Sequence, residues 1–389
     1  MTTVHRWMAT MLSLEVLLGC RHAPAPAGSS TGDAAALVPD RGLPAQPAAV
    51  TAPPDEARAA PAPTATVHFL GRFDTRDPAG PRFAWPGSAI VARFTGTGIA
   101  VRLHDRGKNY FNVVVDGGAP RAVATSRAAG AYTLASGLGP GEHTVVLTKR
   151  TESHVGVVQF LGLVPTGGAL LPSPEPFARR IEYVGDSISC GYGDLAPAAS
   201  WHFSDSTEDE TIAYDSLAAA ELDAQQTVVA SSGVGLLRDS GGSTVNQMPV
   251  LFERTLADDP TSAWTFAAPP PDVVVIALGT NDFAAGDPGT AFQRAYVAFV
   301  GRVRAHYPSA QIVCANGPML REPAHGRARG YIQGAISDLV AAGDRKVSYL
   351  EFEPQQDADG YGCDYHPSPA THRKMARTLV EAIRARTGW

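Results

Sequence analysis

The sequence predicts an α/β domain with a doubly wound parallel sheet, preceded by a small all-β sandwich. Three observations lead to this prediction. From about residue 177 onward, short apolar runs alternate with longer segments of helical periodicity. Between residues 64 and 168, short β-rich runs are separated by turn signals and show no helical period. A Pro-rich stretch at 171–176 is a stiff connector between these two patterns.

Length and composition narrow the class of protein. The chain has 389 residues, more than one ordinary domain needs, and 44% of them are hydrophobic, which excludes a wholly disordered protein. The net charge is −6 and there is no Lys/Arg-rich run, so nothing in the composition supports nucleic-acid binding. No apolar stretch reaches the ~20 residues that span a bilayer. Four cysteines without a CxxC pair predict neither a disulfide scaffold nor a zinc site.

The first residues resemble an export signal. Residues 1–20 begin with weakly basic His5 and Arg6, continue with a mostly apolar stretch and end in Leu-Leu-Gly-Cys. This pattern is similar to a bacterial lipoprotein signal, in which Cys20 is lipidated and becomes the mature N-terminus. An ordinary secretory signal is the alternative. We therefore expect an exported protein, either a surface or periplasmic lipoprotein or a secreted one.

Residues 21–63 have the composition of a tether. Ala and Pro make up 23 of these 43 residues, and the segment shows no period of 2 or 3.6. Such a segment cannot bury apolar surface, and each Pro removes a backbone donor. We expect it to stay extended and solvated between the anchor and the folded domains.

The next segment, 64–168, predicts a β-sandwich of the jelly-roll type. Asp116-Gly117 lies between two β-rich runs and is a hairpin signal, and further turn residues follow at 139–141. Four aromatic residues of this segment either pack in its core or line a sugar-binding face: Phe83, Trp85, Tyr110 and Phe111. The expected strands are 89–94, 99–103, 110–115, 143–148 and 155–163.

The α/β pattern occupies residues 177–389. Residues 273–278 are all apolar, so both faces of this strand would be apolar, as in a parallel strand that is covered on both faces. Within 290–306, apolar side chains recur every three or four residues and form one stripe. The expected strands are 181–184, 227–230, 272–278, 311–315 and 347–352, and the expected helices are 212–222, 290–306, 331–342 and 369–386.

Chemically capable residues follow the ends of the predicted strands. Ser187 follows the first strand, Gly233 the second and Asn281 the third, while His366 lies between the last strand and the last helix. In a doubly wound sheet the ligand site lies beyond the carboxyl ends of the strands. Each residue alone is also typical of a cap or a turn. Their joint occurrence in this order predicts one site.

These residues suit the hydrolysis of an ester. Ser187 supplies a nucleophilic hydroxyl, and His366 supplies a base whose pKa near neutrality lets it accept and return the serine proton. The oxyanion needs fixed donors, for which the backbone N–H groups of Ser187 and Gly233 and the side-chain amide of Asn281 are the candidates. Gly233 lacks a Cβ, so its backbone can approach the substrate closely.

The motifs that carry these residues resemble those of a known family. The blocks Gly185-Asp186-Ser187, Gly233, GTND at 279–282 and His366-Pro367 resemble the SGNH (GDSL-like) hydrolases. The strings GDSISCGYG at 185–193 and GCDYHPS at 362–368 are similar to carbohydrate esterase family 2, and so are GEHTV at 141–145 and KRTE at 149–152 in the sandwich. The similarity covers about residues 66–389.

This resemblance implies both a fold and an activity. It implies a flavodoxin-like α/β hydrolase domain after a jelly roll. It also implies a serine esterase without a cofactor or metal, which removes O-acetyl groups from plant cell-wall polysaccharides such as xylan or glucomannan. We expect the protein to act as a monomer.

One departure from the SGNH pattern concerns the residue that orients the histidine. Most SGNH hydrolases have an Asp three residues before the His, where this chain has Cys363, and Asp364 lies only two residues before His366. Either Asp364 orients the imidazole, or a backbone carbonyl does so and leaves a Ser–His dyad, as some members of the resembled family imply. Tyr365 is a candidate aromatic wall for a sugar ring. Arg238-Asp239 stands where the family has an Arg-Asn pair, so substrate contacts there stay open.

The cysteines leave one structural alternative open. Cys190 lies three residues after Ser187, and Cys363 lies three before His366. If the serine and the histidine touch, these two thiols either form a disulfide in an oxidising compartment or remain two buried thiols. Cys314 lies in a predicted central strand, and we expect it to be an inert core residue.

Other functions fit parts of the pattern. The same site would serve a lipase, a thioesterase or an acetyltransferase, although no long apolar insert that would form a lipid-binding lid is present. A noncatalytic carbohydrate-binding surface protein would use the sandwich alone, but it would not need the Ser, Gly, Asn and His set. Metal-dependent hydrolysis has little support, because the sequence has no HExxH and its histidines are scattered.

Overall fold

The computed structural model describes residues 67–172 and 177–389. The expected export signal at 1–20, the candidate lipidation site Cys20 and the expected tether at 21–63 lie outside the described residues. The described residues belong to one compact unit, Ala62–Trp389. Among them, every helix is too short or too polar to span a lipid bilayer.

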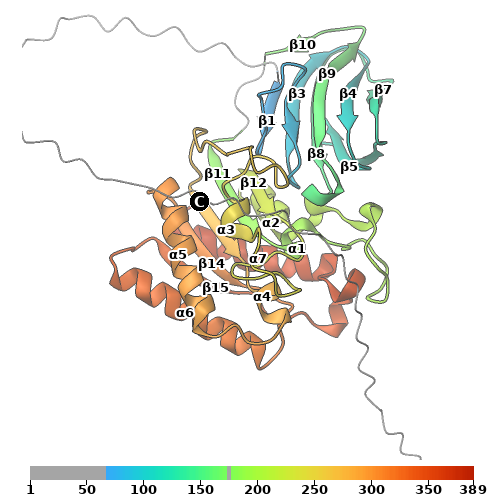
Figure 1. The fold of residues 1–389 in the computed structure, drawn as a ribbon. Helices are drawn as coiled ribbons and strands as arrows, with labels where there is room; N and C mark the ends of the chain where they lie inside the picture. Colours follow the sequence, from blue (N-terminus) through green and yellow to red (C-terminus); the bar gives the residue numbers. More distant parts are fainter. Residues whose placement is uncertain (1–66, 173–176) are drawn as a thin grey trace, which may run out of the picture. The chain divides into compact units, whose positions relative to one another are not determined.

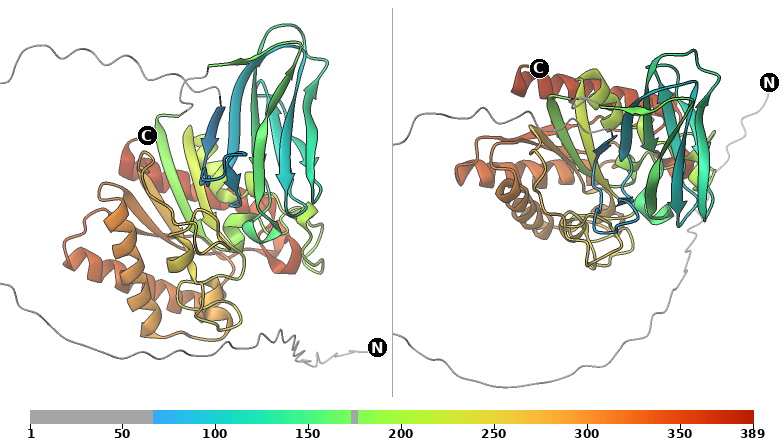
Figure 2. Two further views of the ribbon diagram at one scale, coloured as in Figure 1. Left: turned by 45° about the horizontal axis from the view of Figure 1, so that its top comes forward. Right: turned by 90° about the horizontal axis from the view of Figure 1, so that it is seen from above.

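The first part of this unit is a β-sandwich of two antiparallel sheets, as predicted (Figures 1 and 2). One sheet has the order β1-β3-β8-β5-β6 with β10 on β3, and the other has the order β2-β9-β4-β7. Successive strands largely alternate between the two sheets, which is typical of a jelly roll. The strands are β1 (Val67–Leu70), β2 (Arg82–Phe83), β3 (Ala89–Thr95), β4 (Gly98–Asp105), β5 (Tyr110–Val115), β6 (Arg121–Ala124), β7 (Ala129–Ser136), β8 (Glu142–Lys149), β9 (Val158–Thr166) and β10 (Leu170–Leu171).

The core of the sandwich explains its aromatic residues. Alternate side chains of β4 are buried and exposed, as expected of a strand with one face on a core. Phe83 and Phe111 are buried in this core, with their ring centroids 6.3 Å apart. Trp85 is also buried, but it belongs to a core cluster of the α/β domain. These three aromatic residues therefore pack inside the protein rather than line a sugar-binding face.

The second part is a doubly wound α/β domain. Its five strands are all parallel and have the order β12-β11-β13-β14-β15, which is the flavodoxin-like order. The central strand β13 is buried along its whole length, because helices cover both faces of the sheet. The strands are β11 (Arg179–Gly185), β12 (Ala224–Ala230), β13 (Val273–Ala277), β14 (Gln311–Asn316) and β15 (Val347–Glu351).

Two pairs of helices form the two outer layers of this domain (Figure 1). The apolar side chains of α5 and α6 share one core cluster with one face of the sheet. Those of α2 and α7 share a second cluster with the other face. The helices are α1 (Ser187–Cys190), α2 (Tyr214–Glu221), α3 (Met248–Leu251), α4 (Thr280–Ala284), α5 (Thr290–His306), α6 (Ala324–Ala341) and α7 (Pro369–Thr387). Short 3-10 turns lie at η1 (Ser153–Val155), η2 (Asp205–Thr207), η3 (Glu210–Ile212), η4 (Asp357–Asp359) and η5 (Cys363–Tyr365).

Candidate active site

The predicted site residues lie in turns and short helices that follow the sheet. Strand β11 ends at Gly185, and Ser187 is the first residue of α1, which Asp186 caps by accepting a hydrogen bond from the Ile188 N–H. Asn281 lies in α4, which begins three residues after β13 ends. His366 follows the 3-10 turn η5 and precedes α7.

The structure brings Ser187 and His366 together. The Oγ atom of Ser187 lies 2.9 Å from Nε2 of His366, although the two residues are 179 positions apart in the chain. Ser187 is buried, with 5% of the residue exposed. This distance is within the range for a hydrogen bond between a nucleophile and its base.

The other nitrogen of His366 defines the tautomer of the imidazole. Nδ1 lies 3.2 Å from the backbone carbonyl oxygen of Cys363. A carbonyl can only accept a hydrogen bond, so Nδ1 carries the hydrogen and Nε2 is left with its lone pair toward Ser187. Burial lowers the pKa of His366, although the carbonyl of Cys363 and the charge of Asp364 oppose this shift. The imidazole is therefore neutral at pH 7, as a base for Ser187 must be.

Asp364 does not orient the imidazole, which corrects one of our two expectations for this residue. Its carboxylate accepts hydrogen bonds from the hydroxyl of Tyr192 at 3.3 Å and lies 3.1 Å from Nδ1 of His202. The physical reason is the backbone: Asp364 has a left-handed conformation with φ 48° and ψ 38°, which directs its side chain away from His366. The arrangement is a Ser–His dyad whose histidine is held by a carbonyl.

Tyr192 packs against the catalytic imidazole, and the sequence analysis did not single it out. Its ring centroid is 4.3 Å from that of His366 and 4.6 Å from that of Phe203. The hydroxyl of Tyr192 donates to Asp364 at 3.3 Å. Asp364 thus contacts the ring that supports His366. The position of Tyr192 in the string GDSISCGYG was the signal that could have indicated it.

The segment around Cys363 is held by a close approach to Gly193. The carbonyl of Gly193 accepts a hydrogen bond from the Cys363 N–H at 3.0 Å, and Gly193 has φ +60°. A Cβ atom at this glycine would lie 1.8 Å from Sγ of Cys363, so only glycine fits. This contact fixes the turn whose carbonyl faces His366.

The structure does not join Cys190 and Cys363 in a disulfide. Cys190 and Cys363 are both free and buried. The sulfur of Cys363 lies against Gly193, whereas the sulfur of Cys190 lies close to the carboxylates of Glu152 and Glu208. Burial raises the pKa of both thiols, to about 12 for Cys363. Cys314 is a fully buried residue of β14, as expected.

Asn281 joins the serine segment to the Gly233 segment. Its side-chain Nδ2 donates to the carbonyl of Val234 at 2.9 Å and lies 3.5 Å from Oδ2 of Asp186. Val234 follows Gly233, and Asp186 precedes Ser187, so Asn281 connects the neighbours of the other two oxyanion candidates. Burial raises the pKa of Asp186 to about 7, with the charge of Asp282 adding to the effect.

The loop that contains Gly233 is braced by Asp282. The two carboxylate oxygens of this buried residue accept three backbone hydrogen bonds, from Leu236 at 2.9 Å, Leu237 at 2.6 Å and Arg238 at 3.0 Å. Gly233 itself has φ +76°, a conformation that favours glycine. The loop therefore takes its shape from fixed hydrogen bonds and one left-handed glycine.

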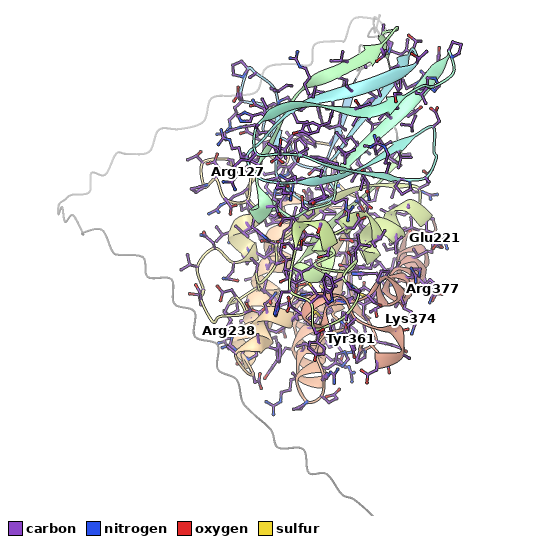
Figure 3. All side chains as sticks on the ribbon, turned by 90° about the vertical axis from the view of Figure 1, so that its right-hand side faces the viewer. Arg127, Glu221, Arg238, Tyr361, Lys374 and Arg377 are labelled. Carbon is purple, nitrogen blue, oxygen red and sulfur yellow. The ribbon has the colours of Figure 1, made fainter. Side chains whose placement is uncertain are left out.

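Arg238 and Asp239 also brace this part of the molecule. Nε of Arg238 donates to the carbonyl of Asp282 at 2.8 Å, and Oδ1 of Asp239 accepts from the N–H groups of Gly241 and Ser243. Figure 3 views the face on which Arg238 lies. Their hydrogen bonds give both residues a role in loop structure.

Tyr365 lies beside the dyad and is 61% exposed. Its backbone is left-handed, with φ 60°, and its carbonyl accepts a hydrogen bond from Gln355 at 2.7 Å. The ring of Tyr361, labelled in Figure 3, is 5.7 Å from its own. Tyr365 directly precedes His366 in the chain, and an exposed aromatic ring is a suitable surface for a sugar.

Glu152, Cys190 and Glu208 could be considered as metal ligands in the described part of the chain, because their ligand atoms lie within 4.8 Å of one another. Two properties make this group a poor ligand set. Both carboxylate oxygens of Glu152 accept hydrogen bonds from Ser232, and burial raises the pKa of Cys190, which disfavours the thiolate. The chemistry of the site follows from the dyad and its donors.

Two family models match the described domains. The model described as carbohydrate esterase 2 N-terminal matches residues 69–174, and the GDSL-like lipase/acylhydrolase family matches residues 183–374. The first match covers the sandwich, and the second covers most of the α/β domain, including Ser187 and His366.

Characterised relatives carry esterase names. The chain is 39% identical over 326 residues to a protein named cellulase/esterase CelE from Acetivibrio thermocellus; the match covers 83% of this chain and 40% of that protein. It is 28% identical over 333 residues to an acetylxylan esterase / glucomannan deacetylase of Cellvibrio japonicus, with 83% and 89% of the two chains covered.

Solved structures are similar over the same region. A family two carbohydrate esterase from Clostridium thermocellum in complex with cellohexaose matches with a TM-score of 0.81 and 39% identity, covering 83% of this chain and 99% of that one. A family two carbohydrate esterase from Cellvibrio japonicus matches with a TM-score of 0.77 and 27% identity, covering 83% and 96%.

Proposed function

The chain belongs to carbohydrate esterase family 2, and on this premise we propose that it is a serine esterase that removes O-acetyl groups from plant cell-wall polysaccharide of the xylan or glucomannan type. The observation that carries the proposal is the 2.9 Å contact between Ser187 Oγ and His366 Nε2. The names of the relatives, which include acetylxylan esterase and glucomannan deacetylase, support the substrate class.

The dyad geometry supports a two-step acyl-enzyme mechanism. His366 Nε2 takes the proton of Ser187 as the serine oxygen bonds to the acetyl carbonyl carbon. The carbonyl oxygen becomes an oxyanion, for which the N–H groups of Ser187 and Gly233 and the amide of Asn281 are the proposed donors. As the bond to the sugar oxygen breaks, His366 returns the proton to that oxygen. Water then attacks the acetyl-serine in the same manner and releases acetate.

A carbonyl in place of a carboxylate changes one step of this mechanism. When His366 accepts the serine proton, its Nδ1–H remains bonded to the carbonyl of Cys363 at 3.2 Å. A carbonyl fixes the tautomer as an aspartate does, but it stabilises the imidazolium only through a dipole. The neighbouring charges of Asp364 and Glu152 favour the imidazolium as well, since both raise the pKa of His366.

The exposed aromatic side chains near the dyad support a polysaccharide substrate. Tyr365 is 61% and Trp201 is 53% exposed, and the backbone carbonyl of Trp201 accepts a hydrogen bond from the Asp364 N–H at 3.1 Å. We assign Tyr365 to substrate binding, where its ring would contact a sugar face. Replacement of Tyr365 by Ala should raise KM for acetylated xylan and leave KM for a small aryl acetate unchanged.

The direct experiment is acetate release by the native protein and by Ser187→Ala. We expect the native protein to release acetate from acetylated xylan, acetylated glucomannan and 4-nitrophenyl acetate, and the variant to release almost none. Equal turnover by both proteins would reject the serine as nucleophile. Activity confined to long-chain acyl esters would indicate a lipase, and transfer of the acetyl group to an alcohol faster than to water would indicate an acetyltransferase.

We further propose that the protein is exported and anchored through a lipid on Cys20. The support is the sequence pattern of residues 1–20 and the Ala/Pro-rich segment 21–63 that follows. Expression of the full chain with labelled palmitate should yield a labelled, membrane-associated protein, whereas Cys20→Ser should be unlabelled. Equal labelling of both proteins would exclude Cys20 as the lipidation site.

A further inference from the structure

The β-sandwich contributes a buried carboxylate to the loop that carries Gly233. Glu152 lies three residues after the end of β8 and is fully buried. Its Oε2 accepts a hydrogen bond from the backbone N–H of Ser232 at 2.7 Å, and its Oε1 accepts one from the hydroxyl of Ser232. Both oxygens of one sandwich carboxylate are thus bonded to a single residue of the α/β domain.

The contact between Glu152 and Ser232 matters because of where Ser232 lies in the chain. Ser232 directly precedes Gly233, so its backbone dihedral angles determine where the N–H of Gly233 points. Glu152 holds Ser232 at two atoms, the backbone nitrogen and the side-chain oxygen, which restricts rotation about the bonds between them. On the other side of Gly233, Val234 is held by Asn281, and the next residues are held by Asp282. The loop therefore lies between two buried carboxylates, one from each domain.

The surroundings of Glu152 favour its charged form. Lys149 is fully buried, and its Nζ donates to the backbone carbonyl of Glu152 at 3.0 Å. His154 Nδ1 lies 3.1 Å from Oε2 of Glu152. The backbone N–H of Glu152 donates to Glu208 at 2.9 Å, and burial raises the pKa of Glu208 far above its usual value. Burial raises the pKa of Glu152, but its hydrogen bonds to His154 and Ser232 outweigh this effect and lower that pKa below its usual value. A charged acceptor forms stronger hydrogen bonds than a neutral one.

We propose that Glu152 is a positioning residue that fixes the oxyanion-binding conformation of the Ser232–Gly233 segment. This inference rests on the proposed function, because it takes the Gly233 N–H as an oxyanion donor. It gives the β-sandwich a part in the reaction, because Ser232 owes two of its hydrogen bonds to a residue of this domain. The KRTE string at 149–152, which resembles the family pattern, contains this anchor and the lysine beside it.

The alternative role for Glu152 is adhesion between the two domains, and a matched control separates the two roles. Asn112 of β5 is another buried sandwich residue that bonds to the α/β domain, through Asp209 at 3.0 Å and Thr211 at 2.7 Å. It has no hydrogen bond to the Gly233 loop among those of the described residues. Asn112→Ala therefore removes interdomain hydrogen bonds and leaves the oxyanion loop in place.

The experiment compares Glu152→Ala, Glu152→Gln, Ser232→Ala and Asn112→Ala in the full chain with 4-nitrophenyl acetate. We expect Glu152→Ala to lower kcat by about 10- to 100-fold, the scale of a misplaced oxyanion donor, while KM changes by less than about twofold. Glu152→Gln should recover part of kcat, because its amide oxygen still accepts from the Ser232 N–H. Ser232→Ala should lose less than Glu152→Ala, since the N–H contact remains.

A second readout depends on the oxyanion alone. Phosphonylation of Ser187 by a 4-nitrophenyl alkylphosphonate also develops charge on an oxygen that the same donors stabilise. In each Glu152 variant, the rate of phosphonylation should fall by the same factor as kcat for 4-nitrophenyl acetate. Asn112→Ala should lower Tm and leave both rates unchanged.

Several results would overturn the inference. A kcat equal to the native value in both Glu152→Gln and Ser232→Ala would overturn it. These two variants provide the test if Glu152→Ala does not fold. An equal loss of kcat in Asn112→Ala and Glu152→Ala at equal loss of Tm would also overturn it, since adhesion alone would then explain both. Failure of the proposed function is distinct from these results, because the native protein itself would then release no acetate.

Discussion

Arg72 and Glu152 are both buried charged side chains of the sandwich that bond to the α/β domain, but they bond to different kinds of partner. Arg72 donates to Glu182 in strand β11 at 2.6 Å and to the carbonyl of Arg254 at 2.9 Å. Its guanidinium also lies 5.1 Å from the ring centroid of Phe252. Glu152 bonds to Ser232, next to the proposed oxyanion donor. One contact ties the sandwich to the frame of the sheet, and the other ties it to a loop of the active site.

Within one interface, the contact of Arg72 is therefore expected to stabilise the fold, and the contact of Glu152 is expected to position a loop of the active site. Both contacts remove a charge from water, which is favourable only when each charge has a partner of good geometry. Replacement of Arg72 should leave the proposed catalytic residues in place. Replacement of Glu152 should release the loop that carries the proposed oxyanion donor Gly233, and the rate of ester hydrolysis depends on the position of that donor. The same kind of contact can therefore have an effect on folding in one place and on catalysis in another.

The largest loss of kcat is expected when the Ser187–His366 dyad is broken. The losses expected for the Arg72 and Glu152 variants are compared with this value. Replacement of His366 by Ala should lower kcat for 4-nitrophenyl acetate by about 10⁴-fold, because Ser187 loses its base. Thermal unfolding should show a folded protein whose Tm is lowered only by the lost contacts of the imidazole, among them its packing on Tyr192. Steady-state kinetics with the native protein as control measure this. A loss below about tenfold would place the base elsewhere.

The next effect concerns Asp282, which braces the same loop as Glu152 from the α/β side. Replacement of Asp282 by Ala should lower kcat by about 100-fold, because three backbone N–H groups lose their acceptor and the loop relaxes. In the double variant Asp282→Ala/Glu152→Gln, the factor by which kcat falls should differ from the product of the factors for the two single variants, because the two carboxylates hold one loop. Strictly multiplicative losses in this cycle would mean that the two braces act independently.

Arg72 should show the opposite profile to Glu152. Arg72→Met should lower the free energy of unfolding by about 3–5 kcal/mol, because it leaves Glu182 buried without its cation. At a temperature where the variant is folded, its kcat should equal that of the native protein. Chemical denaturation and kinetics on the same preparation give both values. A loss of kcat without a loss of stability would show that this contact also shapes the active site.

Asp364 should have the smallest effect on the rate. Asp364→Asn should change kcat by less than about threefold, the scale of a partly exposed polar contact, because the carbonyl of Cys363 holds the imidazole. The pH profile is more sensitive. Burial places the pKa of His366 below 6.5, so kcat/KM should rise with pH through a midpoint below 6.5 and then level off.

The same variant should move that midpoint in a defined direction. The negative charges of Asp364 and Glu152 both raise the pKa of His366 against the effect of burial. Removal of the Asp364 charge should therefore shift the acidic midpoint of kcat/KM to lower pH. A shift to higher pH would contradict this charge effect, and a loss of kcat comparable to that of His366→Ala would return Asp364 to the role of orienting residue.

The fold could be predicted from the sequence wherever periodicity was strong. The apolar stripe of 290–306 has the bounds of α5, and all five parallel strands were expected. Helix α6 begins at Ala324, seven residues before the predicted start, because Gly326 and Gly330 weaken the helical signal there. Strand β7 was missed, since its Ala- and Gly-rich sequence is mostly exposed and has only a weak β pattern.

The site was predictable only for residues at strand ends. Ser187 and His366 could be paired because parallel strands bring their carboxyl ends to one edge. The direction of the Asp364 side chain could not be predicted, because it depends on a left-handed backbone that no periodicity reveals. Nor could the contact between Glu152 and Ser232, which joins two domains across 80 residues of sequence through side-chain geometry.

Trapping the acyl-enzyme tests the central claim most directly. The native protein should be mixed with 4-nitrophenyl acetate, quenched in acid within the first turnover, and digested for peptide mass spectrometry. The account predicts one acetyl group on the peptide that contains Ser187, and none on that peptide in Ser187→Ala. An acetyl group on another residue, or acetate release with the same rate from Ser187→Ala, would contradict it.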